Sequence, residues 1–281
     1  MDIDNHVGFS KILDPELWKY IQRNNIPVNG REDEHVASID MYSSNPHWPN
    51  IEAILKKNKG HWQSDTIFTK DELAQAQWMR VRTIWRIGYP QPMNGFGYQT
   101  ITYTRDHYCD KCGIGLEQVD AFRIQKVPSW GRRHFFAPFW VEDELFVSEA
   151  VKNAFQDAGI TGVAFMEVRD RTGKRVFDGV YQLRILNVLE KGLVNSPENL
   201  RSCSICEKCG RSKSRSNVGI RVQYNSSVFD NAPDIVKTGD YFGVAGNMSP
   251  ARKIIISQKT YQTIVKHELD RNLMFYPIDL V

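Results

Sequence analysis

The pattern of apolar and polar positions near the start of the chain predicts one helix surrounded by irregular structure. The stretch "DPELWKYIQRN", residues 14–24, opens on an Asp-Pro pair and places Leu17 and Ile21 on one helical face. Residues 29–66 are polar and interrupted by Asn, Pro, Gly and Ser, which is typical of loops. We therefore expect residues 1–100 to form an N-terminal segment of helical and irregular structure.

A second helix is predicted for "FTKDELAQAQWMRVRTIW", residues 68–85. Thr69 and Glu72 have the spacing of a capping box, in which each side chain accepts a hydrogen bond from the other residue's backbone amide. Apolar residues then recur at intervals of three and four, which favours one amphipathic helix. Gly88 and the prolines after it end the pattern, because they do not continue a helix.

Two later segments share one pattern: an apolar strand, a serine, about ten residues of helical periodicity and a second apolar strand. They are residues 144–168, "ELFVSEAVKNAFQDAGITGVAFMEV", and residues 253–278, "KIIISQKTYQTIVKHELDRNLMFYPI". Ser148 and Ser257 stand where helix N-caps are expected. Because each segment follows a CxxCG sequence in the same order, the pattern indicates a duplicated unit.

All five cysteines lie in two short stretches, "CDKCG" at residues 109–113 and "SCSICEKCG" at residues 202–210. A CxxC turn followed by glycine is typical of a zinc knuckle, in which two thiolates reach one ion. One knuckle supplies two ligands and a structural zinc ion needs four, so we predict that both knuckles bind a single Zn²⁺. The predicted ligands are Cys109, Cys112, Cys206 and Cys209.

The sequence leaves alternatives to this site open. They are a redox-active CxxC pair, unpaired thiols, and a site completed by a histidine such as His107. Cys203 is surplus to a two-ligand knuckle, and we expect a small buried residue there or a spare ligand that exchanges with Cys206. Four bound thiolates leave no coordination position for an activated water, so the predicted zinc is structural rather than catalytic.

Together these patterns predict an α+β fold. Two related repeats, each made of a zinc knuckle, a strand, a helix and a strand, are expected to share the metal site behind an N-terminal helical segment. The predicted domains are residues 1–100 for the N-terminal segment, 101–195 for the first repeat and 196–281 for the second.

Composition narrows the class of protein. The chain has 281 residues, of which 41% are hydrophobic and 25% charged, as is usual for a globular protein. No apolar run approaches the roughly 18 residues that a membrane-spanning helix needs, so no membrane association is expected. The opening "MDIDNHVGFSKILD" differs from a secretory signal, and clustered CxxC pairs differ from a secreted disulfide framework. These features predict a cytoplasmic protein.

Sequence motifs for catalysis are missing. The chain has no GxSxG, HExxH or P-loop sequence, and its histidines are scattered singly, so we expect no enzymatic activity. The carboxylate runs at residues 31–34 and 142–144 are expected to be solvated turns or faces. Four aromatic residues downstream of the first knuckle are expected in the core, namely Phe135, Phe136, Phe139 and Trp140.

Basic residues behind the second knuckle suggest an alternative function. Zinc knuckles flanked by cations and aromatic rings occur in nucleic-acid-binding proteins, where the cations contact phosphates. The formal net charge of the chain is only +3, which does not by itself indicate nucleic acid. In this alternative, a zinc-ribbon nucleic-acid-binding or regulatory protein, the contacts would come from Lys208, Arg211, Lys213 and Arg215.

The ordered set of motifs resembles the double-CXXCG motif family of myxobacterial paralogues. The resemblance spans residues 69–281 and rests on "FTKDELAQAQW", "GYPQP", the two knuckles "CDKCG" and "CEKCG", "DELFVSEAV", "KIIISQKTY" and the closing "LMFYPI". Cys203, the basic loop at residues 211–215 and the first sixty residues depart from that pattern. Members of the family include immunity proteins encoded beside polymorphic toxins. The resemblance therefore implies a non-enzymatic protein that binds and neutralises a cognate toxin, the product of a neighbouring gene.

Overall fold

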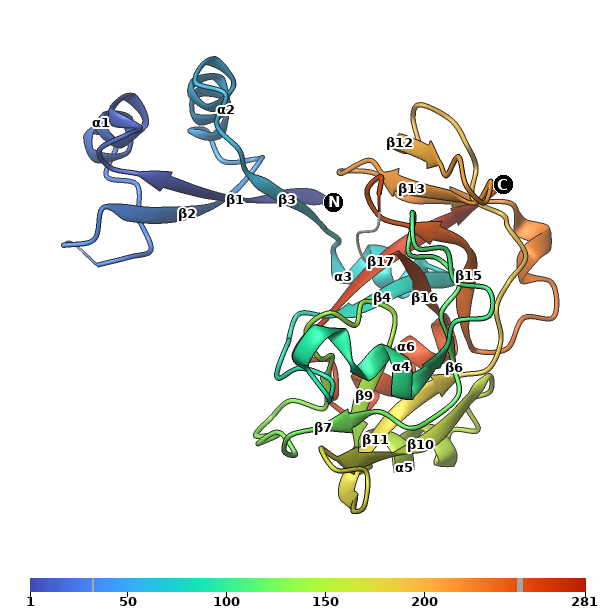
Figure 1. The fold of residues 1–281 in the computed structure, drawn as a ribbon. Helices are drawn as coiled ribbons and strands as arrows, with labels where there is room; N and C mark the ends of the chain where they lie inside the picture. Colours follow the sequence, from blue (N-terminus) through green and yellow to red (C-terminus); the bar gives the residue numbers. More distant parts are fainter. Residues whose placement is uncertain (32, 247–249) are drawn as a thin grey trace. The chain divides into compact units, whose positions relative to one another are not determined.

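Most of the ordered structure in this protein is β-strand. The computed structural model describes residues 1–31, 33–246 and 250–281. Strands make up 36% of the chain and helices 20%, and the strands form curled half-barrel sheets (Figure 1). The predicted α+β fold of two zinc-knuckle repeats behind a helical segment is therefore wrong. The chain divides into two units, Met1–Glu72 with Val218–Ile220, and Leu73–Asn217 with Arg221–Val281.

The first unit is a three-stranded antiparallel sheet with two helices packed on one face (Figure 1). Asn5, Val7 and Phe9 alternate along the central strand and are buried, because successive side chains of a strand point to opposite faces. In order along the chain, the elements are β1 (Asp2–Ser10), α1 (Pro15–Arg23), β2 (Val36–Tyr42), α2 (Trp48–Lys57) and β3 (Gln63–Ile67).

The helix predicted at residues 14–24 is confirmed as α1, which buries Leu17 and Ile21. Residues 29–66 are not the loop region that was predicted, since they contain β2, α2 and most of β3. The prediction was wrong because the polar residues of this region lie on one face of the sheet. The alternate positions Ala37, Ile39 and Met41 pack against the helices.

The second unit contains the remaining sheets, and the domain boundaries predicted at residues 100 and 195 both lie within it. One sheet has seven strands in the order β12-β13-β15-β16-β4-β17-β14. Its strands are β4 (Trp78–Thr83), β12 (Leu200–Ile205), β13 (Ser212–Ser216), β14 (Val222–Tyr224), β15 (Ile235–Phe242), β16 (Ala251–Ser257) and β17 (Leu273–Leu280).

The second sheet of this unit has five strands in the order β7-β10-β11-β9-β8, and β5 and β6 form a separate pair. These strands are β5 (Tyr103–Thr104), β6 (Glu117–Gln118), β7 (Arg123–Ile124), β8 (Phe135–Phe136), β9 (Leu145–Ser148), β10 (Val163–Asp170) and β11 (Val176–Ile185). The helices are α3 (Lys70–Gln75), η1 (Asn94–Phe96), α4 (Tyr98–Thr102), α5 (Glu149–Asp157), η2 (Ser226–Phe229) and α6 (Gln258–Lys266), and α3 crosses the boundary between the units.

The two segments with a shared sequence pattern fold as β9-α5-β10 and β16-α6-β17, but in different sheets. In each sheet a further strand separates the two strands of the segment, namely β11 in the first and β4 in the second. One core joins them, since Val147 and Phe155 of the first segment and Ile256 and Ile264 of the second belong to the same buried cluster. The segments are thus two halves of one packed unit.

The helix predicted over residues 68–85 is correct only at its start. The capping box is present, because Thr69 N donates to Glu72 Oε2 at 2.9 Å and Glu72 N donates to Thr69 Oγ1 at 3.2 Å. However, α3 ends at Gln75, and β4 follows as an interior strand of the seven-stranded sheet. Met79, Val81 and Thr83 are buried in alternation, which is the period of two of a strand. The apolar residues around them also recur at intervals of three and four, so the sequence was interpreted as a helix.

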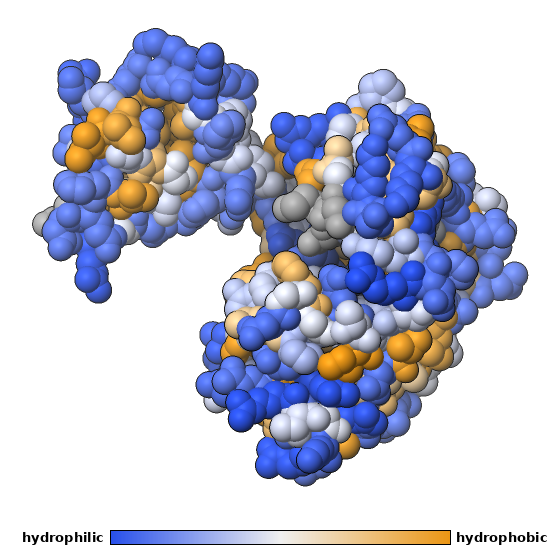
Figure 2. Space-filling view, in the orientation of Figure 1, coloured by the Kyte–Doolittle hydropathy of each residue, from blue (hydrophilic) through white to orange (hydrophobic). Residues whose placement is uncertain are grey.

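Hydrophilic residues dominate the face of the protein shown in Figure 2, with hydrophobic side chains gathered in small separate areas. Among the described residues, no helix has both the length and the apolar character to cross a membrane.

Candidate metal centre and adjoining cleft

Two turns of matching geometry bring the cysteines together. In the first turn Cys109 N donates to Ile114 O at 2.8 Å and Gly113 N donates to Cys109 O at 2.7 Å. Gly113 has a φ of 77° and Gly210 a φ of 70°, a left-handed conformation that glycine adopts without a steric penalty. The second turn repeats both bonds, from Cys206 N to Arg211 O at 2.9 Å and from Gly210 N to Cys206 O at 2.8 Å.

The four cysteines of these turns converge on one point, and we call this cluster the metal centre. Their sulfur atoms all lie within 4.8 Å of one another. Cys109 Sγ is 3.8 Å from Cys206 Sγ, Cys112 Sγ is 3.6 Å from Cys209 Sγ, and none of the four forms a disulfide. A tetrahedral ion with metal–sulfur bonds of about 2.3 Å requires sulfur atoms about 3.8 Å apart. The arrangement therefore fits a four-thiolate metal site.

Charged residues of the two turns pair across the metal centre. Lys208 Nζ is 2.7 Å from Asp110 Oδ1, and Lys111 forms an ion pair with Glu207. The acidic residue of each CxxC turn thus contacts the lysine of the other turn, so the two ion pairs are reciprocal. These four side chains are exposed, so their contribution is small and sensitive to salt.

Arg211 supports the metal centre from the side of the second turn. Its Nε donates to Cys209 Sγ at 3.4 Å, and one terminal nitrogen donates to His107 O at 2.8 Å. The guanidinium lowers the pKa of the Cys209 thiol to about 6, whereas burial raises the pKa of Cys112 to about 12. Gly115 is required for this packing, since a Cβ at its φ of 109° would lie 1.9 Å from His107 O.

Two of the residues considered as alternative ligands lie outside the cluster. Cys203 is on β12 and exposed, and its sulfur accepts a weak hydrogen bond from Ser214 Oγ at 3.7 Å. The prediction that Cys203 is a small buried residue is therefore wrong. The cluster of possible metal ligands found among the described residues does not include His107, which is also exposed.

The basic residues behind the second turn are used mostly within the protein. Lys208 and Arg211 make the contacts described above. Lys213 on β13 is only 3% exposed, and its Nζ donates to Cys112 O at 3.1 Å and to Gly246 O. The hydrogen bond from the buried Lys213 ammonium to the Cys112 carbonyl therefore connects β13 to the first turn. Arg215 is the one residue of this set that is exposed without such contacts in the described structure.

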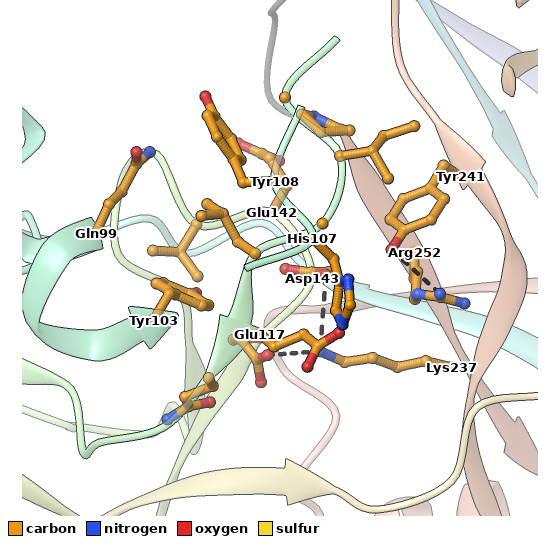
Figure 3. A pocket seen from close by; sticks show the side chains of 18 of the residues that line it. Gln99, Tyr103, His107, Tyr108, Glu117, Glu142, Asp143, Lys237, Tyr241 and Arg252 are labelled. Carbon is orange, nitrogen blue, oxygen red and sulfur yellow. Dashed lines mark hydrogen bonds and ion pairs between the residues drawn. The ribbon is translucent and has the colours of Figure 1, made fainter. Parts of the chain in front are cut away.

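A cleft of about 1140 Å³ adjoins the metal centre within the second unit (Figure 3). One side is formed by residues 113–118, which follow the first CxxCG turn, and another by residues 140–144. Lys237 and Tyr241 of β15 and Arg252 of β16 complete the lining on the side of the seven-stranded sheet. The cleft thus lies between the first CxxCG turn and the seven-stranded sheet.

A network of ion pairs and amides forms the floor of the cleft. Lys237 Nζ lies 2.5 Å from Glu144 Oε1 and 3.7 Å from Asp143 Oδ2. Gln182 Nε2 donates to Glu144 Oε2 at 3.0 Å, and the amides of Gln182 and Gln118 exchange hydrogen bonds of 2.7 Å. Burial disfavours the ammonium, but the two carboxylates outweigh it and keep the pKa of Lys237 above its usual value.

The sequence interpretation missed this floor. Residues 142–144 were expected to be solvated, yet Glu144 is 6% exposed. The signal that could have revealed it is Lys237, which directly follows the apolar strand residues Ile235 and Val236. A lysine buried in such a strand needs a counter-charge.

Four exposed aromatic rings pack against one another, and two of them, Phe96 and Trp140, line the cleft. Tyr89, Phe96, Phe139 and Trp140, which we call the aromatic rim, are between 36% and 50% exposed. The Trp140 ring centroid is 4.5 Å from that of Tyr89 and 4.6 Å from that of Phe96, and the Tyr89 and Phe139 centroids are 5.1 Å apart. Phe135 and Phe136 are buried as predicted, but the prediction of a core position is wrong for Phe139 and Trp140.

The backbone of the aromatic rim is strained. Phe96 has a φ of 55° and Trp140 a φ of 70°, in the left-handed region that bulky residues rarely occupy. Each such residue costs about 1–3 kcal/mol and persists only where the surrounding contacts impose it.

Comparisons of the sequence with protein-family models and with curated proteins give no match. The metal centre and the cleft therefore define the candidate site on geometry alone.

Proposed function

We propose that this protein is a non-enzymatic immunity protein that binds and neutralises a cognate polymorphic toxin on a zinc-stabilised scaffold. The observation that carries the proposal is the convergence of the two CxxCG turns, the residues on which the resemblance to the double-CXXCG family chiefly rests, into one four-sulfur cluster. A four-thiolate site is coordinatively full, so its metal holds the fold and leaves recognition to the surface. The function places the protein in the cytoplasm, where thiols stay reduced.

Zinc is the proposed ion. Tetrahedral sites of four sulfurs bind zinc or iron, and a structural role, with no change of oxidation state, favours zinc. Elemental analysis of the purified protein should give one zinc per chain, and Cys112→Ser should lose it while Cys203→Ser keeps it. An iron content near one per chain, or a full zinc content in Cys112→Ser, would contradict the proposed four-cysteine zinc site.

Neutralisation is tested by co-expression with the product of the neighbouring gene. That product alone should arrest the growth of a heterologous host, and this protein should restore growth and co-purify with it in a fixed ratio that survives nuclease treatment. Cys203→Ser should protect fully, because its sulfur lies outside the metal centre. Growth arrest that persists despite comparable soluble amounts of this protein would contradict the proposal.

Nucleic-acid binding is the second candidate, and an uneven distribution of charge favours it. Residues 1–72 carry eight basic and twelve acidic side chains, a formal net charge of −4, whereas residues 73–281 carry 28 basic and 21 acidic, a net charge of +7. Against it, Lys208, Arg211 and Lys213 each contact other groups of the protein. Arg215 is therefore the informative residue.

Charge reversal by Arg215→Glu separates the two functions without touching the metal centre. If nucleic acid is the ligand, the variant should bind more weakly than the wild type and show a shallower dependence of affinity on salt. If neutralisation is the function, Arg215→Glu should protect cells as well as the wild type. If nucleic acid stays bound to both the wild type and Arg215→Glu after nuclease and salt treatment, neither function is supported.

A further inference from the structure

We infer that the cleft beside the metal centre is a binding site for a nucleotide, whose phosphate groups contact the basic side chains of the lining. This function goes beyond the one proposed above, because neutralising a toxin does not require a bound nucleotide. Three observations support the assignment: an excess of positive charge around the cleft, a pair of hydrogen-bond donors on the seven-stranded sheet, and exposed aromatic rings in the lining.

Positively charged side chains outnumber carboxylates around the cleft. Its lining has six cations and four carboxylates, namely Arg105, Arg184, Lys191, Arg211, Lys237, Arg252, Glu117, Glu142, Asp143 and Glu144. Lys237 forms an ion pair with Glu144, and Arg86, which lies outside the lining, forms one with Glu142. Because these pairs are neutral, five cations and two carboxylates of the lining remain.

The metal centre adds its own charge. A divalent ion bound by four thiolates has a net charge of about −2, which the neighbouring cations Arg211 and Lys213 offset. Four cations and two carboxylates are then left, a net charge of about +2 (4 − 2). They are Arg105, Arg184, Lys191, Arg252, Glu117 and Asp143. The cleft as a whole therefore attracts anions.

Two of these arginines are half-buried without a counter-charge. Arg184 and Arg252 form no ion pair within the part of the chain that the structure describes. Their guanidinium groups donate to backbone carbonyls instead, Gln118 O at 3.2 Å and Thr238 O at 2.7 Å. A carbonyl accepts a hydrogen bond but leaves the positive charge uncompensated, and a charge withdrawn from water is stabilised by an opposite one. A bound anion supplies that charge.

Tyr241 and Arg252 form a pair of donors for such an anion. They lie directly opposite each other on β15 and β16, and Arg252 donates to the Tyr241 hydroxyl at 3.1 Å (Figure 3). Because this hydroxyl accepts from the guanidinium, its own proton can be donated to a ligand. Arg252 has five N–H groups and uses two of them, on Thr238 and Tyr241. A phosphate oxygen between the two side chains accepts from both.

Aromatic rings in the same lining favour a nucleotide over an anion without a ring system. Phe96 is 50% and Trp140 is 36% exposed, and both line the cleft. Nucleic-acid bases of every kind stack on exposed aromatic faces. The volume of about 1140 Å³ has room for a base, a sugar and phosphates together. A free nucleotide and a nucleotide of a single strand share this chemistry, so the test includes both.

The test is isothermal titration calorimetry of the full, zinc-loaded chain at low salt. The probes are ATP, an oligonucleotide of eight deoxyadenosines, and tripolyphosphate, which carries charge without a base. At least one nucleotide probe should bind ~10-fold or more tightly than tripolyphosphate. Tighter binding of ATP identifies a free nucleotide as the ligand, whereas tighter binding of the oligonucleotide identifies a single strand.

Substitutions then locate the site. Tyr241→Phe, which keeps the ring and removes the hydroxyl, should weaken nucleotide binding about fivefold, and Arg252→Gln about tenfold. Phe96→Asn/Trp140→Asn should weaken nucleotide binding about tenfold and leave tripolyphosphate binding unchanged. Asparagine is chosen because it tolerates the left-handed backbone.

Arg171→Gln is the matched control, because Arg171 is an exposed arginine outside the cleft lining and its loss removes the same charge as Arg252→Gln. It should bind nucleotides within about twofold of the wild type, and all variants should keep their zinc content and melting temperature. Three results would each overturn the inference: no binding of either nucleotide probe, tripolyphosphate binding as tight as nucleotide binding, or an Arg171→Gln variant as weak as Arg252→Gln.

Discussion

The metal centre and the aromatic rim both contain residues with positive φ, but they differ in the type of residue that adopts it and in how far its neighbours are buried. Gly113 and Gly210 adopt this backbone freely, whereas Phe96 and Trp140 adopt it at a cost. Around the sulfurs the polar groups find partners within the protein, while at the rim the rings stay largely exposed. The difference indicates that the first region maintains the fold, whereas the rings of the second contribute less to it.

This difference between the two regions can be tested by measuring the stability of variants. Substitutions at the metal centre and the cleft floor should lower the free energy of unfolding most, and substitutions at the rim should change it little.

The largest effect is expected for Cys112→Ser. The site loses one of four thiolates, and because metal binding contributes directly to the folding free energy, we expect the second unit to lose stability on the order of several kcal/mol. Chemical unfolding with and without a zinc chelator measures this, and the chelator should have much less effect on the variant than on the wild type. The control is Cys203→Ser, an exposed cysteine outside the cluster, which should retain the wild-type midpoint.

The next largest effect is expected for Lys237→Met. Removing the ammonium leaves the Glu144 carboxylate buried without its counter-charge, which typically costs about 3–5 kcal/mol. In Lys237→Met/Glu144→Gln the neutral amide still accepts from Gln182, so most of the loss should be recovered. Urea unfolding at pH 7 decides the point, and a single variant as stable as the wild type would mean that the pair does not support the fold.

The metal centre was accessible to sequence reasoning because its information is local. The spacing of two cysteines within each turn and the following glycine fix the ligand geometry, and the requirement for four ligands then joins the two turns. Convergence of Cys109, Cys112, Cys206 and Cys209 followed from this count without any knowledge of the sheets.

The fold was not accessible in the same way, because strand pairing depends on partners distant in sequence. Residues 78–83 form β4, whose neighbours are β16 and β17, about 175 to 200 residues later. The same holds for the cleft floor, where Glu144 and Lys237 are 93 positions apart. Phe139 and Trp140 were predicted in the core because they are hydrophobic, and hydrophobicity alone does not show which aromatic rings are exposed.

A smaller effect is expected when Trp140 is replaced by Asn. The ring is already 36% exposed, so relief of the left-handed strain should largely offset the apolar burial that the indole provides. The free energy of unfolding should therefore change by no more than about 1 kcal/mol, as measured by thermal and urea unfolding. Phe136→Ala is the contrasting variant, since that ring is 1% exposed and its removal leaves a cavity costing about 3–5 kcal/mol. Similar losses of stability in the two variants would place Trp140 in the core and erase the distinction between rim and interior.

The smallest effect is expected at the ion pairs across the metal centre. Asp110→Lys places two cations opposite each other in low salt and should weaken zinc binding at most a few-fold, because both side chains are exposed and screened. Asp110→Lys/Lys208→Asp restores the pair in the reversed sense and should recover the wild-type affinity, while 1 M salt should erase the difference among all three proteins. Zinc affinity measured by competition with a chromogenic chelator resolves changes of this size. If the double variant stays as weak as the single one, the two turns do not select each other by charge, and the thiolates, Lys213 and Arg211 hold them together.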